Sequence, residues 1–416
     1  MIFVYQTFIT ILLIISPIIV FIRILNKKED KKRFIEKFSI PSKKKIAGKL
    51  IWFHGASVGE MKSIIPIIKI YEKKKSISQI LITSSTISSS RVFEKYKFKK
   101  TVHQFYPIDH IFFNKRFLSH WKPNLAIFIE SEIWPSMYDE IYKSNIPLIL
   151  LNARLTNKTF KNWIKIKFFS KLIFEKIKIA FPQNLETKNY LKRLNVKKIN
   201  LIGNLKFAQD EDENQFKISN ELKSKFIKKK IWIASSTHNK EEIFCAKTHL
   251  KLQKKINNLI TIIIPRHIHR TNEIKKEIEK LKLKVALHSD KPKDLENTNI
   301  YIVDAFGETG KFHSIGASVF LGGSIIERGG QNPLEAARYG ARILHGPNID
   351  NFKDVYKLLK VLKVSKKIYK PDQLASSIIF KKNRKIGVKI KNIGEKILKK
   401  TIKELDNLIK NEFKKT

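Results

Sequence analysis

Residues 51–60, IWFHGASVGE, decide the fold class, because a strand, a loop and the start of a helix follow one another within this stretch. The run from Ile51 to Phe53 is typical of the end of a buried strand, and the small residues after it leave room for a tight turn. Glu60 then opens a helical pattern. The order of strand, loop and helix predicts a βα unit, the building block of α/β folds.

Glu60 has two possible roles in this unit. The spacing Ser57-x-x-Glu60 matches a capping box, in which the two side chains satisfy backbone N–H groups at the start of a helix. Alternatively, Glu60 is a carboxylate at the mouth of a cleft, where it accepts a proton. These ten residues leave both roles open.

Seven further apolar runs have the same form as LIWFHG, each ending in small or polar residues: ILITSS, LAIFIES, PLILLNAR, IWIASSTH, LITIIIPRH, NIYIVDAFGE and ASVFLGGS. Charged amphipathic stretches separate the runs. Continuous apolar strands that alternate with helices predict parallel sheets covered on both faces. Ligands of such folds bind at the carboxyl ends of the strands, so the polar run ends are the candidate functional sites.

The sequence pattern of the first βα unit recurs about half a chain later, and we call this recurrence the internal echo. IWIASSTHNKEE, residues 231–242, repeats a strand that begins Ile-Trp, a small-residue loop and an acid at a helix start. The echo is either chance or the mark of two Rossmann-like halves that face each other across a cleft. The polar stretch 206–229 is the expected junction. The predicted organisation is an anchor at 1–25, a first Rossmann-like domain at 26–205 and a second Rossmann-like domain at 206–416.

The N-terminal run 2–25 contains one charge, Arg23, and exceeds the roughly 20 apolar residues that span a bilayer. A basic stretch and no small-residue cleavage site follow it, which predicts a retained signal anchor with the remainder in the cytoplasm. Pro17 leaves a second option, in which the segment lies in one leaflet. An ordinary buried core helix is the third option.

The amino-acid composition limits the kinds of molecule that this protein is expected to bind. The 416 residues include 83 Lys and Arg against 37 Asp and Glu, a formal net charge of +46, which attracts anionic lipid, nucleic acid or an acidic substrate. Compositional drift is the alternative source of this excess, because lysine is abundant throughout the chain. The single cysteine, Cys245, excludes an intrachain disulfide and a thiolate metal cage.

Three clusters in the second half suit an anionic nucleotide. Pro265-Arg266-His267 follows a strand, so it delivers a guanidinium to the strand end. Phe306-Gly307-Glu308 ends another strand and loop, where glycine lets the backbone approach a ligand. Asn332-Pro333-Leu334-Glu335 starts a helix after two glycine pairs, a place that binds phosphate and presents an acid to ribose hydroxyls. Each cluster alone also fits an ordinary turn or a helix-dipole partner.

Nine motifs now carry a resemblance to a known family, and they run through most of the chain in that family's order: WFHGASVGE (52–60), FYPID (105–109), IESEIWP (129–135), LNARLT (151–156), GNLKFA (203–208), ASSTH (234–238), PRH (265–267), DAFGE (304–308) and GGSIIERGGQNPLEAA (322–337). The sequence resembles the 3-deoxy-D-manno-octulosonic acid (Kdo) transferases. These are membrane-anchored GT-B glycosyltransferases that add Kdo from CMP-Kdo to the lipid A precursor. One position departs from the pattern: Gln331 stands where the family often has histidine, which puts any acid role of that position in doubt.

The resemblance implies roles for three charged residues. Glu60 is then the general base, and Glu130 and Lys206 match transition-state residues of the family. Glu130 has a plain alternative as the partner of Arg154, and Glu132 is a candidate for either task. The sequence does not separate these possibilities.

The resemblance also implies the partners. They are CMP-Kdo as donor, the lipid A precursor lipid IVA as acceptor and the anionic inner membrane, with the catalytic domains on its cytoplasmic side. CMP is assigned to Arg266, the Gly307-Glu308 turn and residues 332–335. We expect no cofactor and no metal, because a single phosphodiester has no diphosphate for a metal to bridge.

Two alternatives to this assignment stay open. One is a GT-B transferase that uses UDP and another acceptor. The other is a basic, membrane-anchored binding protein without catalysis. Nucleic acid is not an expected partner, because the 28 Phe lie mostly in apolar runs and not between basic residues.

Overall fold

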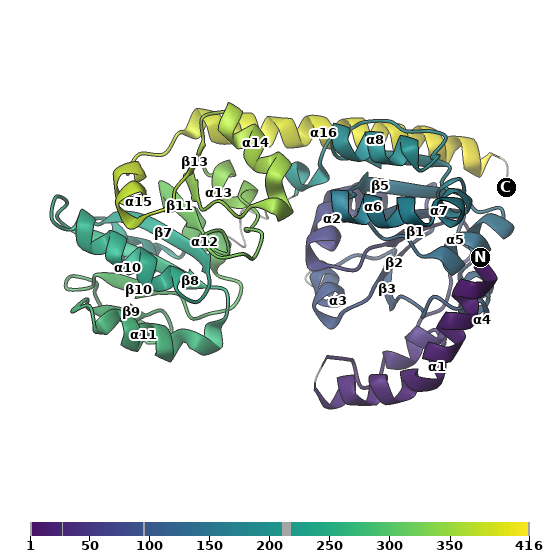
Figure 1. The fold of residues 1–416 in the computed structure, drawn as a ribbon, viewed down its shortest axis with the longest axis horizontal. Helices are drawn as coiled ribbons and strands as arrows, with labels where there is room; N and C mark the ends of the chain where they lie inside the picture. Colours follow the sequence, from purple (N-terminus) through teal and green to yellow (C-terminus); the bar gives the residue numbers. More distant parts are fainter. Residues whose placement is uncertain (1, 27, 95, 210–217, 415–416) are drawn as a thin grey trace. The chain divides into compact units, whose positions relative to one another are not determined.

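The structure is a computed structural model that describes residues 2–26, 28–94, 96–209 and 218–414. The chain divides into two compact units (Figure 1). Unit 1 comprises Met1–Asp210 and Gly394–Thr416, and unit 2 comprises Glu211–Ile393. Each unit is built around one parallel sheet, as the sequence predicts.

Unit 1 contains a six-stranded parallel sheet in the order β3-β2-β1-β4-β5-β6. The strands are β1 (Leu50–His54), β2 (Gln79–Ser84), β3 (Thr101–Phe105), β4 (Leu125–Ile129), β5 (Leu148–Ala153) and β6 (Ile179–Pro182). Strands β2 and β3 lie on one side of β1, and β4, β5 and β6 lie on the other. Because β1 pairs with both β2 and β4, the loops after β1 and β4 flank the switch point of the sheet.

The residues of β1 show how this sheet is covered on both faces. Trp52 points into one core, beside Phe117 and Met137 of helices, while Ile51 and Phe53 point into the opposite core. This alternation is the two-residue period of a strand that is buried on both sides. The helices of unit 1 are α1 (Ile2–Leu25), η1 (Phe34–Phe38), α2 (Val58–Glu72), α3 (Ile87–Glu94), α4 (Ile111–Trp121), α5 (Pro135–Lys143), α6 (Asn157–Lys165), α7 (Lys167–Phe174), α8 (Leu185–Arg193) and η2 (Leu205–Ala208).

Unit 2 contains a seven-stranded parallel sheet in the order β13-β12-β11-β7-β8-β10-β9. The strands are β7 (Lys230–Thr237), β8 (Leu259–Pro265), β9 (Val285–Leu287), β10 (Ile300–Ile302), β11 (Ser318–Leu321), β12 (Arg342–His345) and β13 (Ser365–Lys367). The helices are α9 (Asn220–Phe226), α10 (Glu241–Leu252), η3 (Ile268–Arg270), α11 (Thr271–Glu279), α12 (Thr309–His313), α13 (Leu334–Arg338), η4 (Asp350–Phe352), α14 (Lys353–Val361) and α15 (Pro371–Ser377). The switch point lies between β7 and β11.

The internal echo in the sequence corresponds to equivalent positions in the two sheets. The stretch 51–60 forms β1 and enters α2, and the stretch 231–242 lies in β7 and the start of α10. Both strands are the first of their sheet and border its switch point. The echo therefore marks the two places where such folds bind ligands.

The C-terminal segment differs from the predicted domain organisation, which assigned all of 206–416 to one domain. Helix α16 (Arg384–Phe413) contributes to both units, and the part from Gly394 onward belongs to unit 1. The reason is apolar packing, since Leu405 and Ile409 lie in the unit 1 core with residues of β1 and α2. Of the expected junction 206–229, residues 210–217 lie outside the described residues.

Candidate active site

Three carboxylates of unit 1 lie at the switch point, where the order of the parallel strands reverses. Glu60 is in the first turn of α2, directly after the loop that follows β1. Glu130 and Glu132 follow β4, the neighbour of β1 on the other side of the switch point. Two separate loops thus bring three acids to one edge of the sheet.

Both oxygens of Glu60 accept hydrogen bonds at the start of its helix. The Oγ of Ser57 donates to Oε1 at 2.7 Å, and the backbone N–H of Ala56 donates to Oε2 at 2.7 Å. The N–H of Glu60 in turn donates to Oγ of Ser57. The predicted capping box is therefore confirmed.

The charge state of Glu60 is unusual for a helix cap. The side chain is 8% exposed. Burial first, and then the negative charges of Glu132 and Glu130, raise the pKa of Glu60 to about 7, although the bonds from Ser57 and Ala56 act in the opposite direction. A carboxylate with a pKa near neutrality is suited to accept a proton at physiological pH.

Gly55 makes this placement of Glu60 possible. A Cβ atom at position 55 would lie 2.5 Å from Cε of Met61 and 3.2 Å from Oε2 of Glu60. Any larger residue would displace the carboxylate or the side chain beneath it. The glycine of the loop thus leaves room for the close approach of Met61 and Glu60, and its backbone angle is not unusual.

Glu130 forms an ion pair with Lys206. The Nζ atom of Lys206 lies 2.6 Å from Oε1 of Glu130, and both side chains are largely buried. Lys206 comes from η2, where its N–H donates to the side chain of Asn204. This pair favours Lys206 over Arg154 as the side-chain partner of Glu130, whereas the backbone N–H of Arg154 donates to the carbonyl of Glu130.

Glu130 and Asn152 both have left-handed backbones, with φ of 55° and 53°. Such a conformation is costly for a residue with a side chain, and it concentrates at functional sites. Asn152 lies at the irregularity between β5 and β6, and it donates from Nδ2 to Glu130 at 3.4 Å and accepts the N–H of Leu205 at 3.0 Å. Asn152 thereby links the strand ends to the segment that carries Lys206.

Glu132 is held by two aromatic side chains. Its Oε2 lies 3.2 Å from Nε2 of His54 and accepts the indole N–H of Trp134 at 2.9 Å. Burial alone would raise the pKa of Glu132, but these two contacts outweigh burial and lower it. His54, the last residue of β1, is fully buried and stacks on Tyr106. The sequence-based assignment missed His54, although it lies inside the opening motif.

In unit 2, Glu241 joins the two loops at the switch point. Its Oε2 accepts the backbone N–H groups of His238 at 3.0 Å and Gly323 at 2.7 Å, and its Oε1 accepts those of Ser324 at 3.1 Å and Ile325 at 3.0 Å. The side chain is fully buried. The sequence analysis gave Glu241 no role, and only the internal echo, which has an acid at the start of a helix in both stretches, pointed to it.

Cationic groups surround the end of β7. Burial first, and then His267, Arg328, Arg266 and Arg270, lower the pKa of His238 to about 4. The rings of His238 and His267 are 5.4 Å apart. The side chains of Arg266 and Arg328 are exposed, whereas Pro265 is buried at the end of β8. This cluster suits a phosphate, which would neutralise part of its charge.

The other predicted nucleotide residues lie on neighbouring loops of unit 2. Phe306 is 93% exposed, and Gly307 follows it with φ of 87°. Glu308 precedes α12 and pairs with Lys311 at 2.9 Å.

The Asn-Pro-Leu-Glu stretch begins a short helix. Asn332 accepts the N–H of Leu334 through Oδ1 at 3.1 Å, and Pro333 is the residue before the first helical position. Glu335 lies 3.6 Å from Nδ1 of His313. The carbonyl of Gln331 accepts the hydroxyl of Tyr356.

The structure thus groups the predicted residues in two sets. Glu60, Glu130 and Lys206 gather in unit 1, and the predicted nucleotide residues lie on the strand-end loops of unit 2. Among the residues that the structure describes, no group of three or more His, Cys, Asp or Glu side chains is placed to hold a metal ion. The absence of a metal from the reaction stays a prediction.

These features define a class of protein. Two doubly wound parallel sheets with polar loops at their switch points have the GT-B type of architecture, and an apolar helix precedes them in this chain. A UDP-GlcNAc 2-epimerase from Neisseria meningitidis bound to UDP-GlcNAc has this fold: its TM-score is 0.53 at 14% identity, over 85% of this chain and 100% of that chain.

Relatives identify the family within this class. The family model "3-Deoxy-D-manno-octulosonic-acid transferase (kdotransferase)" matches residues 32–209. The 3-deoxy-D-manno-octulosonic acid transferase of Rickettsia bellii is 34% identical over 94% of this chain and 93% of its own length. The Rickettsia felis enzyme of the same name is 36% identical over 76% of this chain and 68% of its own length. This chain belongs to the Kdo transferase family, and it is a glycosyltransferase with Kdo transferase activity.

Proposed function

We propose that this enzyme transfers Kdo from CMP-Kdo to the lipid A precursor lipid IVA, with Glu60 as the general base. The observation that carries the proposal is the placement of Glu60 at the switch point of unit 1 with a pKa of about 7. At neutral pH a large share of such carboxylates is ionised and still basic enough to accept a proton.

The reaction forms one bond and breaks one bond at the anomeric carbon of Kdo. The acceptor is a sugar hydroxyl and a weak nucleophile, so Glu60 removes its proton as the hydroxyl oxygen bonds to the anomeric carbon. The bond from that carbon to the phosphate oxygen breaks, and CMP leaves with the electron pair. Lys206 stabilises the negative charge on the departing phosphate, and Glu130, 2.6 Å away, holds the ammonium in position.

The donor nucleotide is assigned to unit 2. Arg266, on the loop after β8, contacts the CMP phosphate, and the cationic groups around His238 add to the attraction. The exposed turn at Phe306, Gly307 and Glu308 lets the backbone approach the base. The stretch from Asn332 to Glu335 presents an acid to the ribose hydroxyls. A single phosphodiester joins Kdo to cytidine in the donor, so the reaction needs no diphosphate-bridging metal.

The proposed location is the cytoplasmic side of the inner membrane. A helix of 24 residues begins the chain, its 18-residue window of highest hydropathy has a mean hydropathy of 2.8, and basic residues follow it. Positive flanks stay on the cytoplasmic side of a membrane and attract its anionic lipids.

The test is an assay of nucleotide release. The purified full-length enzyme is incubated with CMP-Kdo and lipid IVA in detergent, and CMP and the glycosylated lipid are measured together. We expect one CMP to be released for each Kdo that is transferred to the lipid, and no reaction when a UDP-sugar replaces CMP-Kdo.

Two outcomes would contradict the proposal. Release of UDP from a UDP-sugar would assign another donor to the same fold. Binding of CMP-Kdo and lipid without formation of product would instead indicate a protein that binds these molecules and does not catalyse.

A further inference from the structure

Helix α1 packs along the surface of unit 1 and does not stand away from it. The hydroxyl of Tyr5 donates to Oδ2 of Asp109 at 2.8 Å, and the Tyr5 ring lies 6.0 Å from that of Phe169 on α7. One turn later, Oγ1 of Thr10 lies 3.2 Å from Nε2 of His110. Val20, near the other end of the helix, is buried. The first half of the helix therefore contacts the folded unit, and near its other end Val20 is shielded from solvent.

The C-terminal end of α1 is tied to the chain that follows it. Nε of Arg23 lies 2.7 Å from Oε1 of Glu29, a buried carboxylate that also pairs with Lys37. Beyond Glu29, the chain begins a buried polar network on the edge of the unit 1 sheet.

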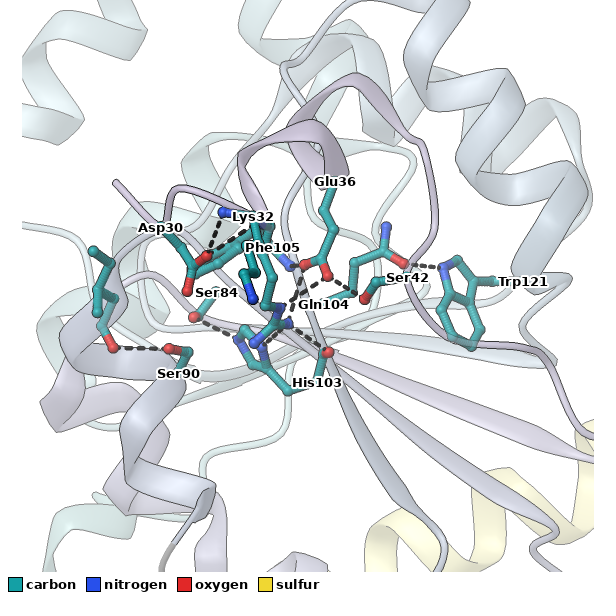
Figure 2. Close-up of polar contacts among 12 residues, drawn as sticks. Asp30, Lys32, Glu36, Ser42, Ser84, Ser90, His103, Gln104, Phe105 and Trp121 are labelled. Carbon is teal, nitrogen blue, oxygen red and sulfur yellow. Dashed lines mark hydrogen bonds and ion pairs between the residues drawn. The ribbon is translucent and has the colours of Figure 1, made fainter. Parts of the chain in front are cut away.

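Figure 2 shows this network around Glu36 and His103. Glu36 is fully buried, pairs with Arg33 at 2.9 Å and accepts the backbone N–H of Phe105 on β3 at 2.7 Å. Arg33 also donates to the carbonyl of His103 at 2.8 Å, and Nε2 of that histidine lies 2.9 Å from Oγ of Ser84. The segment after α1 is thus fixed to β3, which restrains the helix end.

A helix held in this way is not placed to cross a bilayer. Between Tyr5 and Arg23 the helix rises about 27 Å, close to the thickness of the hydrocarbon core, so a spanning helix would carry one of these residues to the far side. Both residues instead contact unit 1. Asp109 cannot follow Tyr5 into lipid, because it also accepts the backbone N–H groups of Ser136 and Met137.

The opposite face of α1 is apolar and exposed. Its large exposed side chains are Phe3, Val4, Phe8, Ile11, Leu12, Ile14, Ile15, Ile18, Ile19, Phe21, Ile22 and Leu25. Monomeric proteins rarely leave so long an apolar face in water, and a lipid leaflet is the partner that covers one without specific contacts.

A second patch with membrane-binding chemistry lies where α6 meets α7. Ile166, Phe168 and Leu172 are exposed, Phe168 by 72%. Lys165, Lys167 and Lys171, also exposed, alternate with them along the chain. Phe169 of the same helix contacts Tyr5, so this α6–α7 corner lies beside the start of α1. Apolar side chains among lysines insert into the interface of an anionic membrane.

We propose that α1 lies in the plane of one anionic leaflet, with its exposed apolar face in the lipid and both of its ends on the same side of the membrane. The α6–α7 corner completes this membrane-contact surface. The proposal rests on the proposed membrane location of the enzyme and chooses between the two arrangements that the sequence left open. It also places the contact with lipid on the unit that carries Glu60.

The two ends of α1 are tested by cysteine labelling of the full-length protein. Cys245 is fully buried, so the unmodified chain is the background control. One variant carries a cysteine in a short Gly-Ser extension before residue 1, and the other is Lys28→Cys. A membrane-impermeant maleimide is added to intact spheroplasts and then after their disruption. We expect neither cysteine to react in intact spheroplasts and both to react after disruption.

Labelling of the N-terminal cysteine in intact spheroplasts, with Lys28→Cys protected, would show a spanning helix and overturn the proposal. It would leave the transferase assignment untouched, because the readout does not involve activity. Recovery of the protein in the soluble fraction would overturn the proposal as well.

Depth in the lipid is tested with a polarity-sensitive dye on single cysteines. The variants are Ile14→Cys on α1 and Phe168→Cys on α7, with Leu185→Cys as the matched control, because Leu185 is an exposed apolar residue of α8. Figure 1 places α8 and α1 at opposite ends of unit 1. On addition of phosphatidylglycerol vesicles we expect a blue shift at positions 14 and 168, quenched by nitroxide-labelled lipid, and no shift at 185. A dye at 168 that stays in water would remove the α6–α7 corner from the surface.

Discussion

The carboxylate of Glu60 accepts two hydrogen bonds at the start of α2 and still has a pKa of about 7. Burial and the charges of Glu132 and Glu130 outweigh the stabilisation that the hydrogen bonds give to the ionised form. Capping and proton transfer are therefore compatible, because the cap fixes the carboxylate while its neighbours keep it basic.

Glu132 offers a direct test of this electrostatic balance. Its negative charge raises the pKa of Glu60, so Glu132→Gln should lower that pKa. Since the base acts in its ionised form, the acidic limb of kcat/KM against pH should move below pH 7 in the variant. The measurement is a pH profile of Kdo transfer for both enzymes.

The matched control is Glu186→Gln, which removes an exposed carboxylate of α8 in the same unit. Its acidic limb should coincide with that of the parent enzyme. A limb of Glu132→Gln that stays in place, or moves to higher pH, would mean that Glu60 is not the group that titrates.

A second prediction at the residue scale concerns Arg266 and the binding of CMP. If its exposed guanidinium contacts the CMP phosphate, Arg266→Ala should weaken CMP binding by about 1.5–3 kcal/mol, because a charge-assisted hydrogen bond is lost. Titration calorimetry with CMP measures this directly. An unchanged affinity would exclude Arg266 from the nucleotide site.

The sequence motifs identified some residues of the candidate site and missed others. Glu60, Glu130 and Lys206 stand in motifs, and the structure brings them to one sheet edge. His54 was missed because its role depends on Glu132, which lies 3.2 Å away across the sheet but 78 positions away in the chain. Such contacts follow from strand order, which the sequence leaves open.

The loops after β7 and β11 behave as one element because Glu241 binds backbone N–H groups of both. A Cβ atom on Gly322 would lie 2.4 Å from the carbonyl oxygen of Ser236 and 2.8 Å from Oε2 of Glu241, so the glycine permits the close approach of the loops. The position of the cationic cluster around His238 depends on this arrangement.

Glu241→Gln should therefore separate the loops. The amide NH2 group would face two of the four N–H donors, and buried donors without partners cost about 1–3 kcal/mol each. We expect a free energy of unfolding lower by at least about 2 kcal/mol and a higher KM for CMP-Kdo, with the KM for the lipid unchanged. Denaturant unfolding and steady-state kinetics measure the two effects.

Glu279→Gln serves as the control, since this carboxylate is exposed at the end of α11 in the same unit. It should leave the KM for CMP-Kdo unaltered. Equal changes in both KM values for Glu241→Gln would indicate general unfolding and would contradict a local role at the donor loops.

The strands were the part of the fold that the sequence predicted best. All eight apolar runs contain strands, because continuous apolar residues between polar loop ends fit only a buried parallel sheet. The course of α16 was not predictable, since its amphipathic pattern does not say which core it covers. The contact of α1 with Asp109 was also hidden, because the sequence does not show which of the few polar side chains in this mainly apolar run face the folded unit.

The whole chain is strongly basic and carries its apolar helix at the N-terminus. Removal of residues 1–25 should release the enzyme from membranes at high salt, because the large apolar face is lost. At low salt the +46 charge should retain a part of it, since anionic lipid still attracts exposed lysines. Sedimentation with inner membranes at about 0.05 M and 0.5 M salt tests both statements, given that salt screens these attractions.

Quantitative sedimentation of the truncated protein at the higher salt would contradict this account of the membrane contact. Residual transfer to detergent-dispersed acceptor should persist in the truncated enzyme, because the helix concentrates the enzyme at its lipid and does not build the acidic site. An inactive but folded truncated protein would show that α1 also supports the site.

The most direct test of the central claim is Kdo transfer to lipid IVA by Glu60→Gln at saturating CMP-Kdo, with a melting curve of each protein. Glutamine keeps the shape and can close the same capping box, but it cannot accept the proton. Turnover should fall by about 10²–10⁴ while CMP binding and folding persist. A folded Glu60→Gln enzyme that retains more than about a tenth of normal turnover would contradict the assignment, return Glu60 to the capping role alone, and direct the search for the base to Glu130 and Glu132.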